Sequence, residues 1–483
     1  MPDPTPPSSA PDTIAAVSTP PGRGGIGIVR LSGADALAIA AHLVVCRSPL
    51  EHARATFARV VDPNDSTATI DDALVTAFLA PNSYTGEDLV EIAAHGSPVV
   101  LEAVLRAALA HGAQLAGPGE FTQRAFLSGR LDLTQAEAVH DLIASQTLDQ
   151  ARVAAQQLGG ALSRRVAPAK ESLLHLIARL EAGMDFASGE LDDVEIVPTA
   201  QIAASISSAA AVLEALAASF ARGQLLRNGA AIAIAGPPNA GKSSLFNRLL
   251  ARDRAIVTPL PGTTRDTLEE SLSLGGIPLR LIDTAGLRSD PSPTRCDEAA
   301  KDGPPVAGLD EAERHGIART HEALADADLV LLVHDITRPL TADERALAAE
   351  LDGRPHLRVL TKLDLLPSAD APQPGAEMWA GAVRTSALSG AGLDELRAAM
   401  LRALYAEGAL AETGALNNLR QQQAVAVALA ALAAAAVSNA SSLPHEMILL
   451  DLHSALREMD SLTGATTPDD ILSRIFSTFC IGK

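Results

Sequence analysis

The stretch that most constrains this chain is Gly236-Pro237-Pro238-Asn239-Ala240-Gly241-Lys242-Ser243. An apolar run, Ala231–Ala235, precedes it, and Ser244–Leu250 follows it with helical spacing. A strand, a glycine-rich turn and a helix in this order are the context of a phosphate-binding P-loop. The glycines allow backbone N–H groups to curl around phosphate oxygens, and the helix N-terminus adds partial positive charge. The stretch predicts a site in which Lys242 reaches the outer phosphates and Ser243 binds Mg²⁺.

Composition places the chain among soluble globular proteins. Its 483 residues suggest about three domains. Apolar residues make up 47% and aromatic residues only 2%, so the cores must be built from aliphatic side chains. No apolar run of about 18 residues has the flanks of a membrane span, and Ala424–Val437, mostly alanine, fits a packed helix better.

Charge and cysteine spacing exclude other classes. The formal net charge of −20 argues against a protein that coats nucleic acid, although Arg164, Arg165 and Lys170 leave a local basic surface open. The cysteines lie far apart, which excludes a disulfide framework or a Cys-pair zinc site and favours a reducing cytosol. These cysteines are Cys46, Cys296 and Cys480.

The chain after a Pro- and Ser-rich leader, residues 1–12, begins as a mixed α/β domain. We expect this domain to span residues 13–130. Strands are predicted at Thr13–Gly33, Asp71–Leu79 and Leu89–Ala93, and helices at Ala34–Val44 and Pro98–Ala110.

Helical periodicity then replaces this pattern on both sides of the P-loop region. Thr134 and Glu137 have the spacing of a capping box, and helical spacing continues to Met184 and from Thr199 to Ala221. Further helices are predicted at Leu419–Ser438, Met447–Ser461 and Pro468–Phe479. The fold class is therefore α/β plus all-α, with a P-loop α/β domain (229–405) inserted between two parts of one helical domain (131–228 and 406–483).

Within the insert, further motifs follow the P-loop in order. Pro261–Asp266 stands where a switch loop offers a hydroxyl to Mg²⁺. A hairpin, Leu268–Leu274 and Ile277–Ile282, leads into Asp283-Thr284-Ala285-Gly286, whose carboxylate and glycine amide suit Mg²⁺ and a γ-phosphate. Leu329–Val333 and Leu357–Leu360 have the character of buried parallel strands. The order is typical of a GTPase.

Thr361-Lys362-Leu363-Asp364 predicts guanine rather than adenine recognition. The Asp364 carboxylate can accept two parallel N–H bonds that adenine does not offer, and Ser386-Ala387-Leu388 can support the base. Such loops usually begin with Asn. The Thr361 hydroxyl replaces only part of an amide's hydrogen bonding, so we expect looser guanine binding.

The group that orients the hydrolytic water is not evident from the residues alone. Leu287, after Gly286, cannot take the role that Gln has in Ras-like proteins. Ser289–Asp310 has the composition of an inserted loop, and Glu311 and Glu313 beyond it are read as exposed charges at a helix start.

Five segments together resemble one family. PPGRGGIGIVR, SYTGEDLVEIAAHG, PGEFTQRAFLSGRLDLTQAEAV, the GTPase insert and the terminal FCIGK resemble the MnmE (TrmE) family of tRNA-modification GTPases over nearly the whole chain. The resemblance implies a folate-binding, dimerising N-terminal domain, a discontinuous helical domain and a Ras-like G domain. It implies a cytoplasmic homodimer that, with the FAD protein MnmG in a heterotetramer, adds an aminomethyl or carboxymethylaminomethyl group at C5 of the tRNA wobble uridine (position 34).

The resemblance also assigns site residues. It implies K⁺ in place of an arginine finger at Asn239, Thr258, Leu260 and Thr263, Mg²⁺ at Ser243 and Thr264, and Glu313 with Lys242 in catalysis. The remaining residues expected at GTP are Ala240, Gly241, Ser244, Asp283, Thr284, Ala285, Gly286, Thr361, Lys362, Asp364, Ser386, Ala387 and Leu388.

The resemblance also implies binding of a tetrahydrofolate derivative, in its 5-formyl or 5,10-methylene form. The residues implied to bind it are Arg30, Glu91, Arg130 and Lys483. From the residues alone, Arg30 and Glu91 are equally well a structural ion pair. Cys480 is either a buried small residue or a reactive catalytic thiol near folate. Two rival functions stay open: a regulatory GTPase in ribosome assembly, and a folate-dependent transferase with a vestigial G domain.

Overall fold

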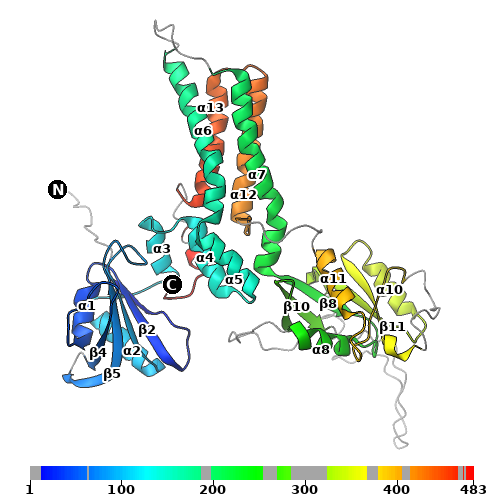
Figure 1. Cartoon of the computed structure of the whole chain (residues 1–483), viewed down its shortest axis with the longest axis horizontal. Helices are drawn as coiled ribbons and strands as arrows, with labels where there is room; N and C mark the ends of the chain where they lie inside the picture. The colour runs from blue at the N-terminus through cyan, green and yellow to red at the C-terminus, as the bar shows by residue number, and fades with distance from the viewer. Residues whose placement is uncertain are drawn as a thin grey trace, which may run out of the picture. The chain divides into compact units, whose positions relative to one another are not determined.

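A computed structural model describes residues 12–62, 65–186, 197–253, 269–283, 324–366, 379–404, 414–465, 472 and 475–482. The chain forms two compact units (Figure 1). The first comprises Met1–Ile143, Ala154–Ala217 and Arg420–Lys483, and the second comprises Ala144–Val153 and Ala218–Leu419. The first unit therefore joins segments that the second interrupts in sequence.

The N-terminal part of the first unit is a seven-stranded sheet in the order β3-β4-β5-β6-β2-β1-β7. All neighbours are antiparallel except β1 and β7. Helices α1 (Ala36–Leu43) and α2 (Pro98–Ala110) bury their apolar sides in the core of this sheet. The strands are β1 (Ile14–Val17), β2 (Gly24–Ser32), β3 (Val44–Cys46), β4 (Ala55–Asp62), β5 (Asp65–Phe78), β6 (Leu89–Gly96) and β7 (Gln114–Leu115).

The prediction of one strand over Thr13–Gly33 is wrong. The segment forms two antiparallel strands, with Val17 opposite Val29. Pro20 and Pro21 cannot donate ladder hydrogen bonds, and Gly22 has a φ of +129°. The chain therefore turns there. Alternating apolar residues on both sides of the turn gave the appearance of a single strand.

The helical part of the first unit is built mainly from four long helices that lie side by side in Figure 1, α6, α7, α12 and α13. Their buried faces include Leu173, Leu213, Leu432 and Leu452. The discontinuous helical domain predicted from sequence is therefore confirmed. The helices of this region are α3 (Glu120–Leu127), α4 (Leu133–Ala144), α5 (Leu148–Leu158), α6 (Ala161–Phe186), α7 (Thr199–Asn228), α12 (Leu419–Ala440) and α13 (His445–Thr463). Of these, α5 and α7 are each divided between the two units, since Leu148–Val153 and Ala218–Asn228 belong to the second.

The capping box predicted at Thr134 and Glu137 is also wrong, by two residues. Asp132 precedes α4, its carboxylate accepts the Gln135 backbone N–H at 2.8 Å, and Gln135 accepts the Asp132 N–H at 2.9 Å. This is the reciprocal pairing of a capping box, with Asp132 as the cap. Glu137 is instead buried and accepts hydrogen bonds from Arg420 and Gln421.

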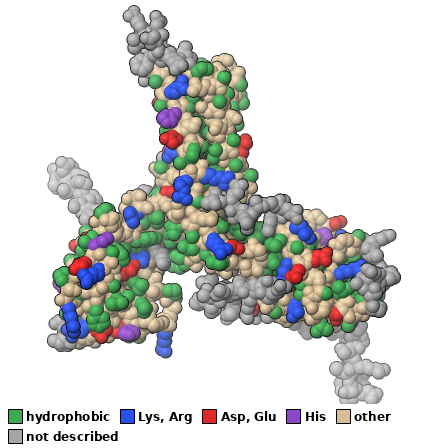
Figure 2. Space-filling view, in the orientation of Figure 1, with side chains coloured by type: hydrophobic (Ala, Val, Ile, Leu, Met, Phe, Trp, Pro, Cys, Tyr) green, Lys and Arg blue, Asp and Glu red, His purple; other side chains and the backbone are tan. Residues whose placement is uncertain are grey.

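Helices α7 and α12 are long and apolar enough to cross a membrane by length and composition alone. Each also contributes side chains to the bundle, including Leu216 and Val425, which are fully buried. Figure 2 shows hydrophobic and uncharged atoms over much of the visible bundle surface. Alanine-rich helices of a soluble bundle satisfy the same criteria, so this observation is weak evidence for a membrane span.

The second unit contains a six-stranded sheet in the order β13-β12-β11-β8-β10-β9, in which only β9 is antiparallel to its neighbour. Helices α8 and α11 pack on one core and α10 on another. The predicted hairpin and buried parallel strands are confirmed. The elements are β8 (Ala230–Ala235), α8 (Lys242–Asp253), β9 (Glu269–Leu274), β10 (Ile277–Asp283), β11 (Leu329–Asp335), α10 (Ala342–Glu350), β12 (His356–Thr361), the 3-10 helix η1 (Leu363–Leu365), β13 (Val383–Arg384) and α11 (Leu393–Leu404).

Candidate nucleotide-binding site

The predicted P-loop joins β8 to α8 at the carboxyl end of the sheet, the edge at which open α/β sheets bind ligands. Gly236 has a φ of +151°, and a Cβ there would lie 2.3 Å from the Val333 carbonyl oxygen. Gly241 has a φ of +93°, and its Cβ would lie 3.3 Å from Thr361 Oγ1. Both positions therefore require glycine, because a side chain would strain the backbone and push the loop from its neighbours.

Lys242 is nearly buried in the first turn of α8. Its Nζ donates hydrogen bonds of 2.9 Å to the carbonyl oxygens of Gly236 and Pro237. The ammonium is therefore held against the P-loop itself, where phosphate oxygens are expected. Ser243 and Ser244 follow in the same turn and are exposed. Asn239, at the tip of the loop, is exposed and left-handed, with a φ of +63°, a conformation that Asn tolerates better than most residues.

The predicted guanine-reading residues form a second loop at the same edge. Asp364 lies in η1, after β12, and its Oδ1 accepts a hydrogen bond from the Ser386 hydroxyl after β13. Ser386 in turn accepts the Ser389 backbone N–H at 3.1 Å. The carboxylate is therefore oriented from the neighbouring loop. Leu388 is 81% exposed, and Ala387 is partly buried beside it.

Thr361 connects this loop to the P-loop. The residue is 2% exposed. Its hydroxyl lies 2.5 Å from the Ala240 carbonyl oxygen and 3.0 Å from the His334 carbonyl oxygen. A threonine hydroxyl has a single proton to share between these two acceptors. The role that the structure gives Thr361 is therefore a tether between loops.

Sequence reasoning missed Asp335, the last residue of β11. Its Oδ2 accepts a 2.6 Å bond from Lys362 Nζ, and its Oδ1 accepts both the N–H and the hydroxyl of Thr337. Burial alone would raise the pKa of Asp335, but the hydrogen bonds from Lys362 and Thr337 outweigh it and lower the pKa. One signal in the sequence could have found it: Asp335 is a carboxylate at the end of a buried strand, and Lys362 directly follows the next predicted strand.

A second buried hydrogen-bonded pair, also missed, lies behind the P-loop. His334 Nδ1 is 2.6 Å from Glu344 Oε1, and His334 Nε2 is 3.1 Å from the Arg338 carbonyl oxygen. The imidazole stacks on Trp379, with ring centroids 5.1 Å apart. Burial would raise the pKa of Glu344, but hydrogen bonds from His334 and Thr341 lower it. Glu344 also closes the capping box of α10 with Thr341.

Other predicted residues lie outside the described part of the chain. Asp283 ends β10, where its backbone is in register with Ile234, two residues before the P-loop. Within the described residues, no group of three His, Cys, Asp or Glu side chains is arranged to hold a metal ion. The predicted positions that fall outside are Thr258, Leu260, Thr263, Thr264, Thr284, Ala285, Gly286, Glu311, Glu313 and Lys483.

In the first unit, the predicted folate residues Arg30 and Glu91 form an ion pair across neighbouring strands. Arg30 Nη2 is 2.7 Å from Glu91 Oε1, and the guanidinium lies 5.6 Å from the Tyr84 ring centroid and 5.5 Å from that of Phe121. Arg130, after α3, is exposed. The geometry is compatible with both interpretations of the pair, a structural one and a ligand-binding one.

The C-terminal segment is docked on this same part of the unit. Ile481 bridges to Pro118, and the Gly119 N–H donates to the Cys480 carbonyl oxygen at 3.3 Å. Gly482 has a φ of +92°, and a Cβ there would lie 2.4 Å from the Val17 carbonyl oxygen. The Cys480 residue is exposed, which contradicts its interpretation as a buried small residue.

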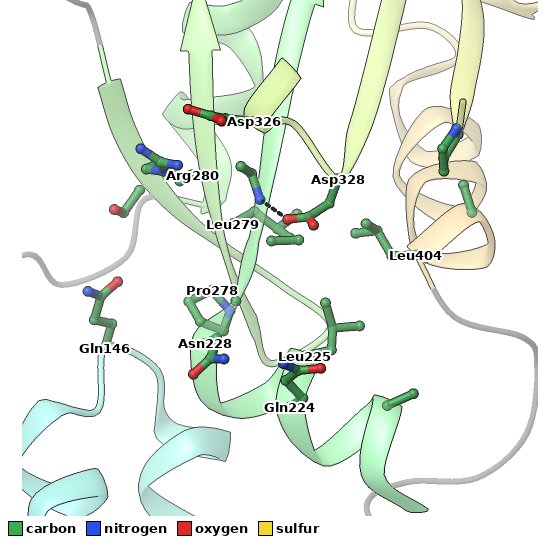
Figure 3. A pocket seen from close by; sticks show the side chains of 17 residues that line it. Gln146, Gln224, Leu225, Asn228, Pro278, Leu279, Arg280, Asp326, Asp328 and Leu404 are labelled. Carbon is green, nitrogen blue, oxygen red and sulfur yellow. Dashed lines mark hydrogen bonds between the residues drawn. The ribbon is translucent and has the colours of Figure 1, made fainter. Parts of the chain in front are cut away.

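The second unit also contains a cavity of about 630 Å³ that is separate from this site (Figure 3). It lies at the amino ends of the parallel strands, next to Ala230, Asp328 and Pro355, whereas the P-loop follows their carboxyl ends. Amide side chains line it from α7 and from the segment before α5, including Gln146 and Asn228. This cavity is therefore not the nucleotide site.

Comparisons with known proteins identify the family of the chain. A family model described as the MnmE helical domain matches residues 133–480, and one described as the GTP-binding protein TrmE N-terminus matches residues 13–130. A "tRNA modification GTPase MnmE" of Koribacter versatilis is 50% identical over 98% of this chain and 99% of its own length. A protein of the same name from Roseiflexus sp. is 41% identical over 98% of this chain and 99% of its own length.

Among solved structures, the G domain of the T. maritima FeoB iron transporter matches 36% of this chain and 99% of its own, at 28% identity and a TM-score of 0.26. At this score the match adds nothing to the fold described above. The relatives match this chain over nearly its whole length, and the two domain models together cover residues 13–130 and 133–480. The chain therefore belongs to the MnmE family of tRNA modification GTPases.

Proposed function

We propose that the second unit binds and hydrolyses GTP at the edge where Lys242, Thr361 and Asp364 meet. The observation that carries this proposal is the Thr361 tether, which brings the P-loop and the guanine-reading loop together around one place. Asp364 selects guanine through paired N–H bonds. Affinities for GTP and ATP test this, because comparable values would contradict the role of Asp364.

Mg²⁺ and K⁺ are the cations that we propose for this site, with Ser243 and Asn239 as the ligands among the described residues. The Ser243 hydroxyl, exposed beside Lys242, is an oxygen donor of the kind that Mg²⁺ prefers, and Thr264 is its proposed companion. The exposed Asn239 amide oxygen suits K⁺, with Thr258, Leu260 and Thr263 as the remaining ligands. The cations supply charge compensation at the phosphates, and Glu313 is the proposed residue that orients water.

The finer function we assign is wobble-uridine modification. With an FAD-dependent MnmG-like partner in a heterotetramer, the chain adds an aminomethyl or carboxymethylaminomethyl group at C5 of uridine 34. The observation that supports this assignment is the docking of the Cys480–Gly482 segment on Pro118, Gly119 and Val17. Val17 ends β1, the neighbour of the strand that carries Arg30. A ribosome-assembly switch would not need a tail built into this sheet domain.

A tetrahydrofolate derivative fits the same region. The Arg30 guanidinium, 14% exposed, lies between aromatic rings and beside Glu91, so cationic, anionic and apolar groups converge there. Arg130 and Lys483 are the proposed further contacts, and Cys480 is exposed on the docked segment. When bound, the folate would supply the one-carbon unit.

Homodimerisation is proposed through the N-terminal sheet. Phe57 and Leu74 are cross-strand neighbours on β4 and β5 and are 58% and 50% exposed. The helix-covered face of the sheet holds its core, so this apolar pair lies where a second copy could cover it. We place the protein in the cytoplasm, with domain boundaries at residues 13–130, 131–228, 229–405 and 406–483.

Mass spectrometry of wobble nucleosides from cells that lack the protein tests the finer function. The expected result is loss of the modified uridines and accumulation of the unmodified base, with restoration by the wild-type gene. Unchanged wobble uridines, together with defective ribosomal subunits, would favour the assembly switch instead. Normal modification by a Lys242→Ala variant would favour the transferase with a vestigial G domain.

A further inference from the structure

Asp335 is the ion-pair partner of Lys362, two residues before Asp364 in the loop proposed to read guanine. Thr361 and Asp335 are opposite each other in the parallel pair of β12 and β11, and the Ile336 N–H donates to the Thr361 carbonyl at 3.2 Å. The two strands therefore end together at the binding edge. Lys362, the first residue after β12, reaches back to Asp335.

The Asp335 carboxylate is itself immobilised. The residue is 3% exposed, and Thr337 donates to Oδ1 twice, from its N–H at 3.0 Å and its hydroxyl at 2.7 Å. This leaves Oδ2 directed at Lys362 Nζ, 2.6 Å away. A carboxylate held on one oxygen by its own loop is a fixed anchor for a cation bound to the other.

Lys362 needs such an anchor, since its backbone is left-handed, with a φ of +62°. That conformation is unfavourable for a residue with a long side chain. Lys362 is the N-cap of η1, in which Asp364 is the second residue. The Leu363 N–H and the Asp364 carboxylate are held from the other side by Thr385 and Ser386. The loop is therefore fixed at both ends, and Asp335 supplies one of them.

We propose that Asp335 is a positioning residue for guanine recognition, acting through Lys362 to hold the Asp364 carboxylate in register with the base. This inference rests on the proposed reading of guanine by Asp364. It gives the buried Asp335–Lys362 pair a role in specificity, beyond folding of the sheet edge. It assigns to Asp335 no contact with the nucleotide.

Asp335→Asn is the direct test, because it keeps the shape and the Thr337 bonds but removes the charge that binds Lys362. The probes are GDP and inosine diphosphate, which differ by the exocyclic amino group that a paired carboxylate reads. We expect the variant to bind GDP about ten-fold more weakly, the scale of a lost charge-assisted hydrogen bond, and to lose less affinity for inosine diphosphate. The preference for GDP over inosine diphosphate should therefore fall.

Arg338→Ala is the matched control. Arg338 Nε lies 3.5 Å from the same Asp335 oxygen, but its side chain is 60% exposed and it lies between β11 and α10, outside the loop that carries Asp364. This variant should leave the preference unchanged. Should Asp335→Asn fail to fold, Lys362→Met removes the same bond from the other partner while keeping the alkyl chain. It should lower the preference by a similar factor.

Three outcomes separate the possibilities. Loss of preference in Asp335→Asn, with Arg338→Ala unchanged, supports the inference. An equal loss for both nucleotides, or no loss, overturns it, since a merely structural residue would not change the ratio. If wild-type protein itself binds both nucleotides equally, the guanine-reading role of Asp364 fails, and the inference falls with it.

Discussion

The hydroxyl of Thr361 lies 2.5 Å from the carbonyl oxygen of Ala240, so the loop proposed to read guanine is bonded directly to the P-loop. The same hydroxyl faces the His334 carbonyl oxygen at 3.0 Å. One proton serves two buried acceptors. Thr361 stands where such loops usually have Asn. We infer that this difference changes the hydrogen bonding between the two loops more directly than it changes contacts with the guanine base.

Thr361→Asn should tighten GDP binding, because an amide carries two N–H donors and can serve both acceptors. Thr361→Val keeps the shape but removes the only donor. It should weaken binding by about ten-fold, the scale of a buried hydrogen bond whose partner is left unpaired. Titration of both variants with a fluorescent GDP analogue measures the effect. Equal affinities for Val and Thr at this position would contradict the tether.

We expect the buried Glu344, behind the P-loop, to make the stability of the fold sensitive to acid. Its pKa is held below its ordinary value of 4.5, mainly by His334 and Thr341 against the opposing effect of burial. A carboxyl whose pKa is lower in the folded state stabilises the fold above pH 4.5 and loses this contribution as the pH falls through the lowered pKa. Glu344→Gln should therefore reduce the free energy of unfolding at pH 7, by about 3 kcal/mol.

Urea denaturation of the full chain between pH 7 and pH 3.5 measures this contribution. The difference between wild type and Glu344→Gln should shrink towards the acid end of the range. Asp343→Asn, an exposed carboxylate in the same first turn of α10, is the control and should change stability little. A difference that is constant with pH would show that the ionised Glu344 is not the stabilising form.

Arg420 and Glu137 join the two sequence halves of the helical domain. Arg420 donates to both Glu137 oxygens, at 2.7 and 3.0 Å, and also to the Ser461 and Leu462 carbonyls. Glu137→Gln should leave a half-buried guanidinium poorly paired and cost about 3 kcal/mol. Thermal unfolding measures it, with Glu171→Gln on the exposed side of α6 as a control. A shift no larger than that of the control would reduce the pair to a surface contact.

The elements with strong periodicity could be predicted from the sequence. The helix at Pro98–Ala110 has the predicted bounds, and the strands around Leu331 and Val359 are buried and parallel. Periodicity reports which side of an element faces a core, so it finds long elements well. It does not report turns. Two prolines and Gly22 divided one predicted strand into β1 and β2.

The site was predictable where a motif is local. Lys242 and Asp364 lie in short motifs with fixed spacing. Both residues lie at the carboxyl edge of the sheet, as predicted. Asp335 and His334 were missed because their partners, Lys362 and Glu344, become neighbours only when strands pair and α10 folds back. A carboxylate whose partner is 27 residues away carries no signature in sequence.

Hydrolysis should depend on K⁺. Leu287 stands where Ras-like proteins have Gln, and the exposed Asn239 offers an amide oxygen to a cation at the loop tip. GTP turnover in KCl should exceed that in NaCl at equal ionic strength, and Asn239→Ala should reduce the difference. Glu313→Ala should bind GTP normally and lose most turnover. Glu311→Ala should bind GTP normally and keep its turnover. Equal rates in the two salts would contradict the cation's role.

The C-terminal segment separates a modification enzyme from a plain GTPase. Chain termini usually fray, so an undocked tail could be removed without effect. Here Ile481 bridges to Pro118, and Gly482 packs so closely on Val17 that a Cβ would lie 2.4 Å from its carbonyl oxygen. Lys483 follows directly, and its ammonium can pair with an anionic part of folate.

Deletion of Cys480–Lys483 should therefore abolish folate binding and wobble-uridine modification, while K⁺-stimulated GTP hydrolysis stays within a few-fold of wild type. Gly482→Ala should reproduce part of the loss, because a left-handed alanine in contact with Val17 displaces the tail. Cys480→Ser keeps the docked backbone and asks whether the thiol itself is needed. Normal modification by the deletion variant would refute the tail's role, and a joint loss of GTP hydrolysis would make the tail a folding element of the helical domain.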